Sequence, residues 1–220
     1  MRSAFSRPRD NVTTLREALS LLRAEARPDQ LAGMARFGII GAGRLGVSMP
    51  VLRRTARRIG RDHALALALW RTGIPDARIL ASLVADPALL TTGQMDAWVT
   101  GFNSWDVCDQ VCLNLFARSP HAWGRIRAWA GRPEEYVRRA AFALIACVAW
   151  HDETTPDRRF IALLPLIVRA SSDERNFVRK AVNWALRHIG KRNPALNRAA
   201  IATARKIGAR NNRAARWIAA

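Results

Sequence analysis

The sequence predicts an all-helical protein built as an α-solenoid of stacked antiparallel helix pairs. Strand signals are nearly absent, because the chain has one Tyr and no sustained alternation of apolar and polar residues bounded by turns. Apolar residues recur at helical spacing along almost the whole chain instead. A short motif also recurs 41 residues further on, as is typical of a repeat protein.

Caps and breakers divide the chain into successive helices. Gly73-Ile74-Pro75 and Asn193-Pro194 are typical joints, because Gly and Pro interrupt a helix and Asn caps the next one. Ser48 is expected to cap a helix that has Pro50 near its first turn. The predicted helices, in order, are Thr14–Ala26, Asp29–Phe37, Ser48–Ile59, Asp62–Thr72, Pro75–Ala85, Thr92–Phe102, Ser104–Arg118, Ala122–Ala130, Glu134–Trp150, Pro156–Ala170, Glu174–Ile189, Ala195–Ile207 and Arg213–Ala219.

The repeated motif defines the architecture. Residues 136–141 match residues 177–182, and residues 51–56 are a looser copy. Two helices per unit and a period of roughly 27–41 residues are the signature of a HEAT-like α-solenoid, in which stacked pairs place equivalent helices on one concave surface. We expect one such domain over residues 1–220, with residues 1–12 flexible and a helical pattern that continues past Ala220.

The charge of the chain is strongly positive and unevenly distributed. A formal net charge of +19 arises from 36 Lys and Arg against 17 Asp and Glu. Between Arg175 and Ala220 there are twelve Lys or Arg and no Asp or Glu. A genome that favours arginine explains Arg in place of Lys, but it does not explain the missing acids. The pattern favours binding to nucleic acid in a basic concave groove; an anionic membrane surface, or no polyanion at all, are the alternatives.

No secretory or membrane-spanning segment is visible in the sequence. The N-terminus, MRSAFSRPRDNVTT, lacks the apolar region of a signal peptide, and no uncharged run approaches about 18 residues. Cys108, Cys112 and Cys147 form no CxxC motif, so we interpret them as reduced core residues rather than metal ligands. These observations favour a cytoplasmic protein with no cofactor and no metal. We also expect a monomer that is associated with the nucleoid.

A glycine motif near residue 40 resembles a dinucleotide-binding loop. Gly41-Ala-Gly43-Arg-Leu-Gly46 matches GxGxxG, which in a Rossmann unit follows a strand and opens a helix. Here a helical pattern precedes the motif, and the expected second strand is replaced by another helix. We interpret the segment as a loop between helices, and a loop whose amides and Arg44 contact a phosphate is the alternative.

The stretch from Ser104 to Cys112 could carry chemistry. If Ser104 caps a helix, Trp105 and Asp109 lie one turn apart on the same face. A Trp ring removes water from beside a carboxylate and strengthens its electrostatic effect. Asp106 makes a carboxylate pair an alternative, and acids in a first turn also favour the helix dipole with no catalytic role.

Three motifs are informative in this order and spacing: Asn103-Ser-Trp-Asp-Val-Cys-Asp109, Tyr136-Val-Arg-Arg-Ala-Ala141, and the run from Phe177 to Pro194 with Trp184 inside it. Together with Gly46–Arg53 and Leu69-Trp70, they resemble the AlkD-like DNA alkylation repair family over roughly residues 25–210.

This resemblance implies a HEAT-like DNA glycosylase that cradles duplex DNA and removes positively charged N3- or N7-alkylated purines. It implies that Asp109 is the catalytic carboxylate, that Trp105 and Trp184 flank the lesion nucleotide, and that Arg139 is the basic residue at the site. The family also contains members that bind DNA, including branched forms, without excision.

The chemistry agrees with these residues. A cationic purine is a good leaving group, so the barrier lies in forming an oxocarbenium-like sugar, which one carboxylate can stabilise. On this interpretation Asp109 serves the chemistry and not the fold. The remaining tryptophans, among them Trp150 and Trp217, are expected to pack in the core or between repeats. The residues expected to contact DNA are Arg44, Arg138, Arg179, Lys180, Arg187, Lys191 and Arg192.

Overall fold

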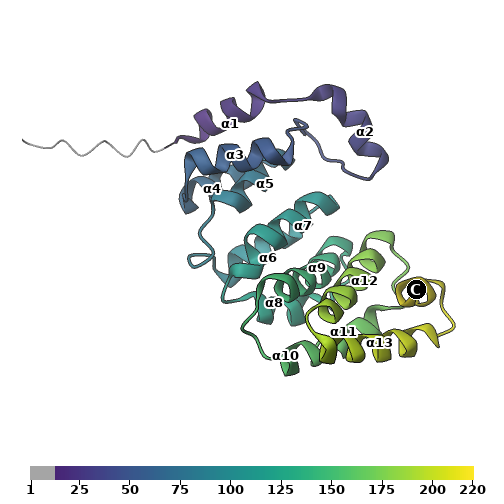
Figure 1. Cartoon of the computed structure of the whole chain (residues 1–220). Helices are drawn as coiled ribbons and strands as arrows, with labels where there is room; N and C mark the ends of the chain where they lie inside the picture. The colour runs from purple at the N-terminus through teal and green to yellow at the C-terminus, as the bar shows by residue number, and fades with distance from the viewer. Residues whose placement is uncertain (1–12) are drawn as a thin grey trace, which may run out of the picture.

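A computed structural model describes residues 13–220 as a curved stack of helices (Figure 1). The expectation of flexibility for residues 1–12 lies outside this described range. No strand occurs within residues 13–220, so the predicted all-helical solenoid is confirmed. No helix of the described part has the length and apolar character needed to cross a membrane.

Most helices begin and end where caps and breakers predict them. A Thr14 capping box opens the first helix and a Thr91 capping box opens the sixth. The helices are α1 (Leu15–Ala24), α2 (Leu31–Arg36), α3 (Met49–Ile59), α4 (His63–Arg71), α5 (Pro75–Val84), α6 (Thr92–Thr100), α7 (Trp105–Asn114), α8 (Ala122–Trp129), α9 (Glu135–His151), α10 (Asp157–Ile161), α11 (Leu164–Ala170), α12 (Asn176–Lys191), α13 (Pro194–Gly208) and α14 (Arg213–Ala219), with 3-10 turns η1 (Pro28–Gln30) and η2 (Phe116–Arg118).

Three predicted helices are each divided in two. The predicted helix Pro156–Ala170 becomes α10 and α11, because Pro165 lies in the first turn of α11 and cannot donate to the preceding turn. The predicted helix Asp29–Phe37 becomes η1 and α2, and Ser104–Arg118 becomes α7 and η2. In these two cases a short 3-10 turn continues the helical spacing that the apolar pattern shows.

The helices form an inner row flanked by a second set. In the inner row, α3 packs on α5, α5 on α7, α7 on α9, and α9 on α12. The flanking helices α4, α8 and α13 pack against α5, α9 and α12 respectively. The centre of the core is α9, in which every residue from Arg139 to Ala149 is buried. Its many alanines let α7 and α12 pack closely against it.

The glycine motif forms a loop between α2 and α3, as predicted. The buried carboxylate of Asp76 accepts hydrogen bonds of 2.8 Å from the backbone amides of both Leu45 and Val47. Gly46 has φ +76°, and a Cβ on it would lie 2.5 Å from the carbonyl oxygen of Arg27. A Cβ on Gly41 would likewise lie 2.7 Å from Pro75, so Gly41 and Gly46 allow close packing of the loop. The described chain has no strand before this loop, which a dinucleotide site requires.

Candidate active site and nucleic-acid interface

The inner helices lie in parallel, so their N-terminal ends gather at one edge of the row. There the first turns of α7, α9 and α12 meet the end of α2 around a pocket of about 620 Å³. The pocket is lined by Ala35, Arg36, Phe37, Gly38, Trp105, Arg139, Asn176, Phe177 and Lys180. We call it the Trp105 pocket. Three of the predicted site residues line it: Trp105, Arg139 and Lys180. Trp105 and Lys180 are 75 residues apart in sequence.

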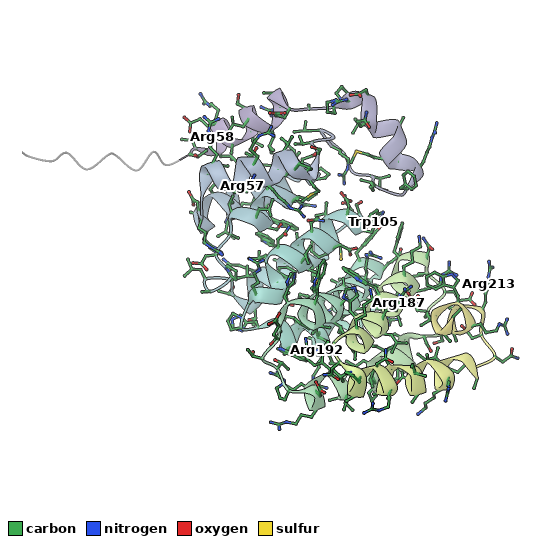
Figure 2. The ribbon with its side chains drawn as sticks, viewed as in Figure 1. Arg57, Arg58, Trp105, Arg187, Arg192 and Arg213 are labelled. Carbon is green, nitrogen blue, oxygen red and sulfur yellow. The ribbon has the colours of Figure 1, made fainter. Side chains whose placement is uncertain are left out.

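Trp105 is the first residue of α7 and is half-buried at the edge of the inner row (Figure 2). Its Nε1 donates a 2.9 Å hydrogen bond to the carbonyl oxygen of Phe37, at the end of α2. Gly38 follows, and its Cα lies so close to the Phe177 ring that a Cβ would come within 2.8 Å of it. The N-terminal helices therefore orient the indole ring from the opposite wall of the pocket.

Asp109 lies one turn beyond Trp105 and is held by Arg139. The arginine donates from Nε to Oδ1 at 3.0 Å and from Nη2 to Oδ2 at 2.6 Å, and its Nη1 donates to the carbonyl oxygen of Phe177 at 2.6 Å. The guanidinium carbon lies 5.9 Å from the centre of the Trp105 ring. This fork joins α7, α9 and α12, so Asp109 contributes to the fold, and the expectation that it has no part in the fold is wrong. Its catalytic role stays a prediction.

Burial sets the protonation behaviour of this pair. It raises the pKa of Asp109, and the charge of Arg139 partly offsets that rise. Burial alone would lower the pKa of Arg139, but Asp109 outweighs it and the pKa of the guanidinium is raised. The two-point geometry is that of an ionised carboxylate held by a guanidinium, with 16% of the Asp109 side chain still exposed.

Asp106 and Arg44 form a separate ion pair. Nη1 and Nη2 of Arg44 donate to Asp106 at 2.9 and 3.1 Å, and Nη2 also donates to the carbonyl oxygen of Ile40 at 3.0 Å. The hydroxyl of Ser104 donates to the same carboxylate. Arg44 is only 9% exposed, so the structure gives it a role in anchoring the glycine loop rather than the phosphate contact predicted for it. Asp106 and Asp109 each bind their own arginine and form no carboxylate pair.

Trp184 does not line the Trp105 pocket. It is half-buried one turn after Lys180 on α12, and its ring meets that of His188 edge to face at 5.7 Å between centroids. His188 lies 5.7 Å from Trp150, which stacks on His151 at 5.2 Å with an 8° angle between the planes. We call these four side chains the aromatic series.

The aromatic series ends in an exposed ring. Trp150 is 58% exposed and Trp217 is 42% exposed, so neither packs in the core. Both contact a neighbouring helix, Trp150 through His188 and Trp217 through Arg179, which agrees with the other half of the expectation, packing between repeats. Burial, followed by the charges of Lys191 and Arg187, lowers the pKa of His188, which keeps its ring neutral at pH 7. A pocket of about 850 Å³ adjoins Trp150 and is lined by both acidic and basic residues.

The other basic residues expected to contact DNA divide into two groups. Lys180, Arg187 and Lys191 are exposed along one side of α12. The second group is engaged within the protein: Arg138 pairs with Asp173 at 2.8 Å, Arg179 lies over the Trp217 ring at 4.8 Å, and Arg192 donates to the Ala149 carbonyl at 2.8 Å. Arg138 and Arg192 therefore have fewer free donors for phosphate than their sequence positions suggested.

Sequence reasoning missed the pocket residues that come from α2 and from the start of α12. Arg36 and Phe37 end α2, and no local pattern shows that this helix end reaches Trp105. Within residues 13–220, no group of three or more His, Cys, Asp or Glu side chains is arranged to hold a metal ion. Cys108 and Cys112 are free and buried, as predicted.

Comparison with known proteins decides the family. The sequence model of the DNA alkylation repair enzyme family matches residues 18–219. The chain belongs to this family. Its fold is that of a HEAT-like solenoid: a solved protein from a new family related to the HEAT-like repeat DNA glycosylases, with affinity for branched DNA structures, superimposes with a TM-score of 0.77. That protein is 19% identical over 93% of this chain and 92% of its own.

A designed armadillo repeat protein is a more distant structural match. It is 14% identical over 94% of this chain and 97% of its own, with a TM-score of 0.40. No curated protein sequence matches the chain. The resemblance noted in the three motifs thus agrees with membership of the DNA alkylation repair enzyme family over nearly the whole described chain.

Proposed function

We propose that the protein is a monofunctional DNA glycosylase that excises positively charged N3- or N7-alkylated purines from duplex DNA. The observation that carries this proposal is the Asp109 carboxylate, which is 16% exposed, is fixed by Arg139 and lies one helical turn from Trp105. Arg139 and Trp105 line the pocket, and Asp109 lies directly behind Arg139. Membership of the DNA alkylation repair enzyme family supports it. We further propose that the protein acts as a monomer on nucleoid DNA in the cytoplasm.

The reaction breaks the bond between the sugar C1′ and the purine nitrogen. The bonding electron pair leaves with the base and neutralises its positive charge, so no general acid has to protonate the leaving group. The sugar becomes an oxocarbenium-like cation, and water then adds to C1′ and releases a proton to solvent. A fixed carboxylate near C1′ stabilises that cation without the cost of reorienting water dipoles.

The residues around Asp109 orient its carboxylate and bind the nucleotide. Arg139 orients the carboxylate at two points, and its own charge is matched by that carboxylate, so the pair adds no net repulsion to a cationic base. The Trp105 ring offers its electron-rich face to a cationic nucleotide, an attraction on the order of 1–2 kcal/mol when water is excluded. Lys180 lines the same pocket, where its charge suits a flanking phosphate.

The test is incubation with duplex DNA that carries N7-methylguanine or N3-methyladenine, scored by chromatography for free base. We expect release of the alkylated base and an abasic strand that breaks only after alkali treatment. Strand cleavage without alkali, or a trapped covalent adduct on Lys180 after borohydride reduction, would contradict a monofunctional enzyme.

The second candidate is a DNA-binding protein without excision activity that prefers branched or damaged DNA. The aromatic series favours it, because an exposed Trp150 stacked on His151 is a platform for unpaired bases. The solved structural neighbour has affinity for branched DNA structures, which supports the same alternative. If no alkylated base is released while a four-way junction binds more tightly than duplex of equal length, this alternative replaces the glycosylase.

A further inference from the structure

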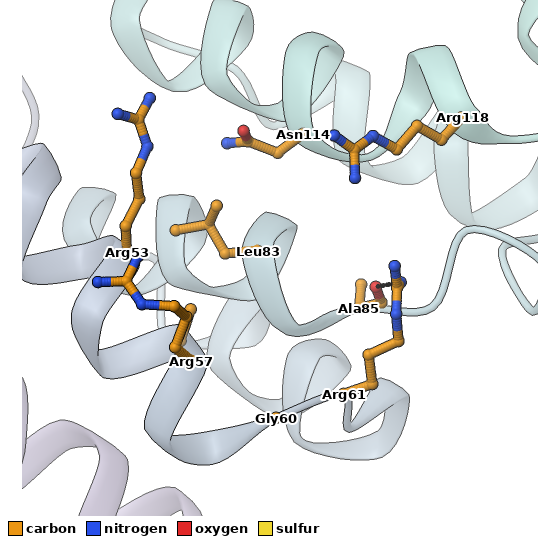
Figure 3. A pocket seen from close by; sticks show the side chains of 9 residues that line it. Arg53, Arg57, Gly60, Arg61, Leu83, Ala85, Asn114 and Arg118 are labelled. Atoms are coloured by element: carbon orange, nitrogen blue, oxygen red, sulfur yellow. Dashed lines mark hydrogen bonds between the residues drawn. The ribbon is translucent and has the colours of Figure 1, made fainter.

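A separate pocket of about 530 Å³ lies at the opposite edge of the inner row, where α3, α5 and α7 end (Figure 3). Four arginine side chains surround it, together with the amide of Asn114, and none of its lining residues is acidic. We call it the arginine pocket. Its arginines are Arg53, Arg57, Arg61 and Arg118.

Four elements build this pocket: α3, α5, α7 and the 3-10 turn η2, which carries Arg118. Arg53 and Arg57 lie one turn apart on α3, and Arg61 follows the end of that helix (Figure 3). Nη1 of Arg61 donates a 3.1 Å hydrogen bond to the carbonyl oxygen of Ala85, the C-cap of α5. The side-chain amide of Asn114, the last residue of α7, donates at 3.2 Å to a buried serine hydroxyl on α5. The floor of the pocket is therefore fixed in place.

Three of the four guanidinium groups here have no partner within the described protein, unlike the two buried arginines at the Trp105 edge. At the Trp105 edge, Arg44 and Arg139 each bind both oxygens of a carboxylate. Among the residues that the structure describes, Arg53, Arg57 and Arg118 make no side-chain hydrogen bond and no ion pair within 4.0 Å. Like charges crowded into one cavity raise its potential, which an anion relieves.

Helix dipoles do not account for this much charge. Each helix C-terminus carries an effective charge of roughly −0.5, so the ends of α3, α5 and α7 together supply about −1.5. Four guanidinium groups carry a much larger positive charge, and only Arg61 donates directly to a carbonyl oxygen at one of these helix ends. The helix ends therefore leave a net positive charge at the pocket.

We propose that the arginine pocket binds phosphodiester groups of the DNA backbone, at a place separate from the Trp105 pocket. This inference rests on the DNA binding of the proposed function and does not depend on excision. Trp105 and Asn114 are the first and last of the ten residues of α7, so they are about 13 to 14 Å apart along that helix. In Figure 2, Arg57 lies toward the left side of the molecule and Trp105 lies nearer its centre. The protein thus holds the backbone at two separated points.

The experiment measures affinity for unmodified duplex DNA between 50 and 200 mM salt. The test variant is Arg53→Ser with Arg118→Ser, and the matched control is Arg71→Ser with Arg158→Ser. All four arginines are exposed, and the control pair lies on flanking helices with no ion pair in the described structure. Each phosphate contact adds about 0.9 to the salt slope, so the test variant should lose about 1.8 of that slope.

Raising the salt from 50 to 200 mM should weaken DNA binding by wild type, and the factor of weakening should be about tenfold smaller for the test variant. The control variant should keep the wild-type slope to within about 0.5. A test variant with the wild-type slope overturns the inference and leaves the proposed function standing. Absence of salt-dependent DNA binding by wild type itself would refute both.

Free inorganic phosphate carries the same kind of anionic group as the DNA backbone, so it is the alternative ligand for the arginine pocket. Inorganic phosphate is titrated into wild type and into the Arg53→Ser, Arg118→Ser variant by calorimetry at constant ionic strength. We expect no saturable heat below about 10 mM from either, because an open, exposed site holds a single small anion weakly. Saturable binding by wild type that the variant loses would assign the pocket to a free phosphate and overturn the DNA assignment.

Discussion

Asp109 and Asp106 offer a matched pair of substitutions, because each carboxylate on α7 binds a nearly buried arginine at two points. The side chains of Arg139 and Arg44 are 6% and 5% exposed, and those of Asp109 and Asp106 are 16% and 13% exposed. Asp109→Asn and Asp106→Asn therefore remove the same chemical group from nearly the same environment. Each leaves a buried guanidinium with one amide oxygen in place of a carboxylate.

The expected cost to stability is similar for both variants. Removing one partner of a buried pair costs about 3–5 kcal/mol, and the remaining amide oxygen recovers part of it, so we expect about 2–4 kcal/mol. For a chain of this size that corresponds to a fall in Tm of roughly 5–15 °C. Thermal unfolding and urea titration measure it.

The expected effect on excision separates the two. Asp109→Asn removes the charge that stabilises the sugar cation, so the single-turnover excision rate should fall by about 10²–10³ at a temperature where both variants are folded. Asp106→Asn should stay within a few-fold of wild type. If Asp106→Asn loses excision as severely as Asp109→Asn while folded, or Asp109→Asn retains the wild-type rate, the assignment of Asp109 is refuted.

Two further predictions concern stability. Gly46→Ala should lower the free energy of unfolding by about 2–4 kcal/mol, because its φ is +76° and the new Cβ would lie 2.5 Å from a backbone oxygen. Gly33→Ala is the control: nothing lies within 4 Å of its Cβ, so stability should change by no more than about 1 kcal/mol. Burial alone would raise the pKa of Asp173, but hydrogen bonds from Arg175 and Arg138 outweigh it and the pKa is lowered. Such a group stabilises the fold above its unfolded pKa of about 3.9 and stops doing so as pH falls through its folded pKa. Asp173→Asn should therefore cost about 1–2 kcal/mol at pH 7 and progressively less below about pH 4 in urea titrations; a cost that does not depend on pH would contradict this.

Local signals predicted most of the fold. Helical spacing, caps and Pro or Gly joints are encoded within a few neighbouring residues, so helices such as α3, α5 and α9 were placed close to their observed ends. The divided helix at Pro165 was missed because its apolar pattern continues through the break. Placing Trp105 and Asp109 on one face required only the helical period, and it is confirmed by their shared contacts with Arg139.

Pairing across the fold could not be predicted in the same way. Arg44 and Asp106 are 62 residues apart, and nothing in the sequence around either one specifies the other. Counting arginines in a sequence does not show which side chains form ion pairs in the fold. The sequence therefore pointed to the basic segment after Arg175 as the DNA contact and not to the unpaired Arg53 and Arg118. Exposure of Trp150 depends on where α9 ends relative to α12, which is a property of the assembled stack.

The hydrogen bond from Trp105 to Phe37 has a consequence for cooperativity. A solenoid is held together mainly by contacts between adjacent units, so its ends can fray without disturbing the middle. Here α2 touches α7 past the intervening helix pairs, at a separation of 68 residues. Local unfolding of the first repeat therefore also removes one wall of the Trp105 pocket. A ligand that binds in this pocket should in turn stabilise the N-terminal helices against unfolding.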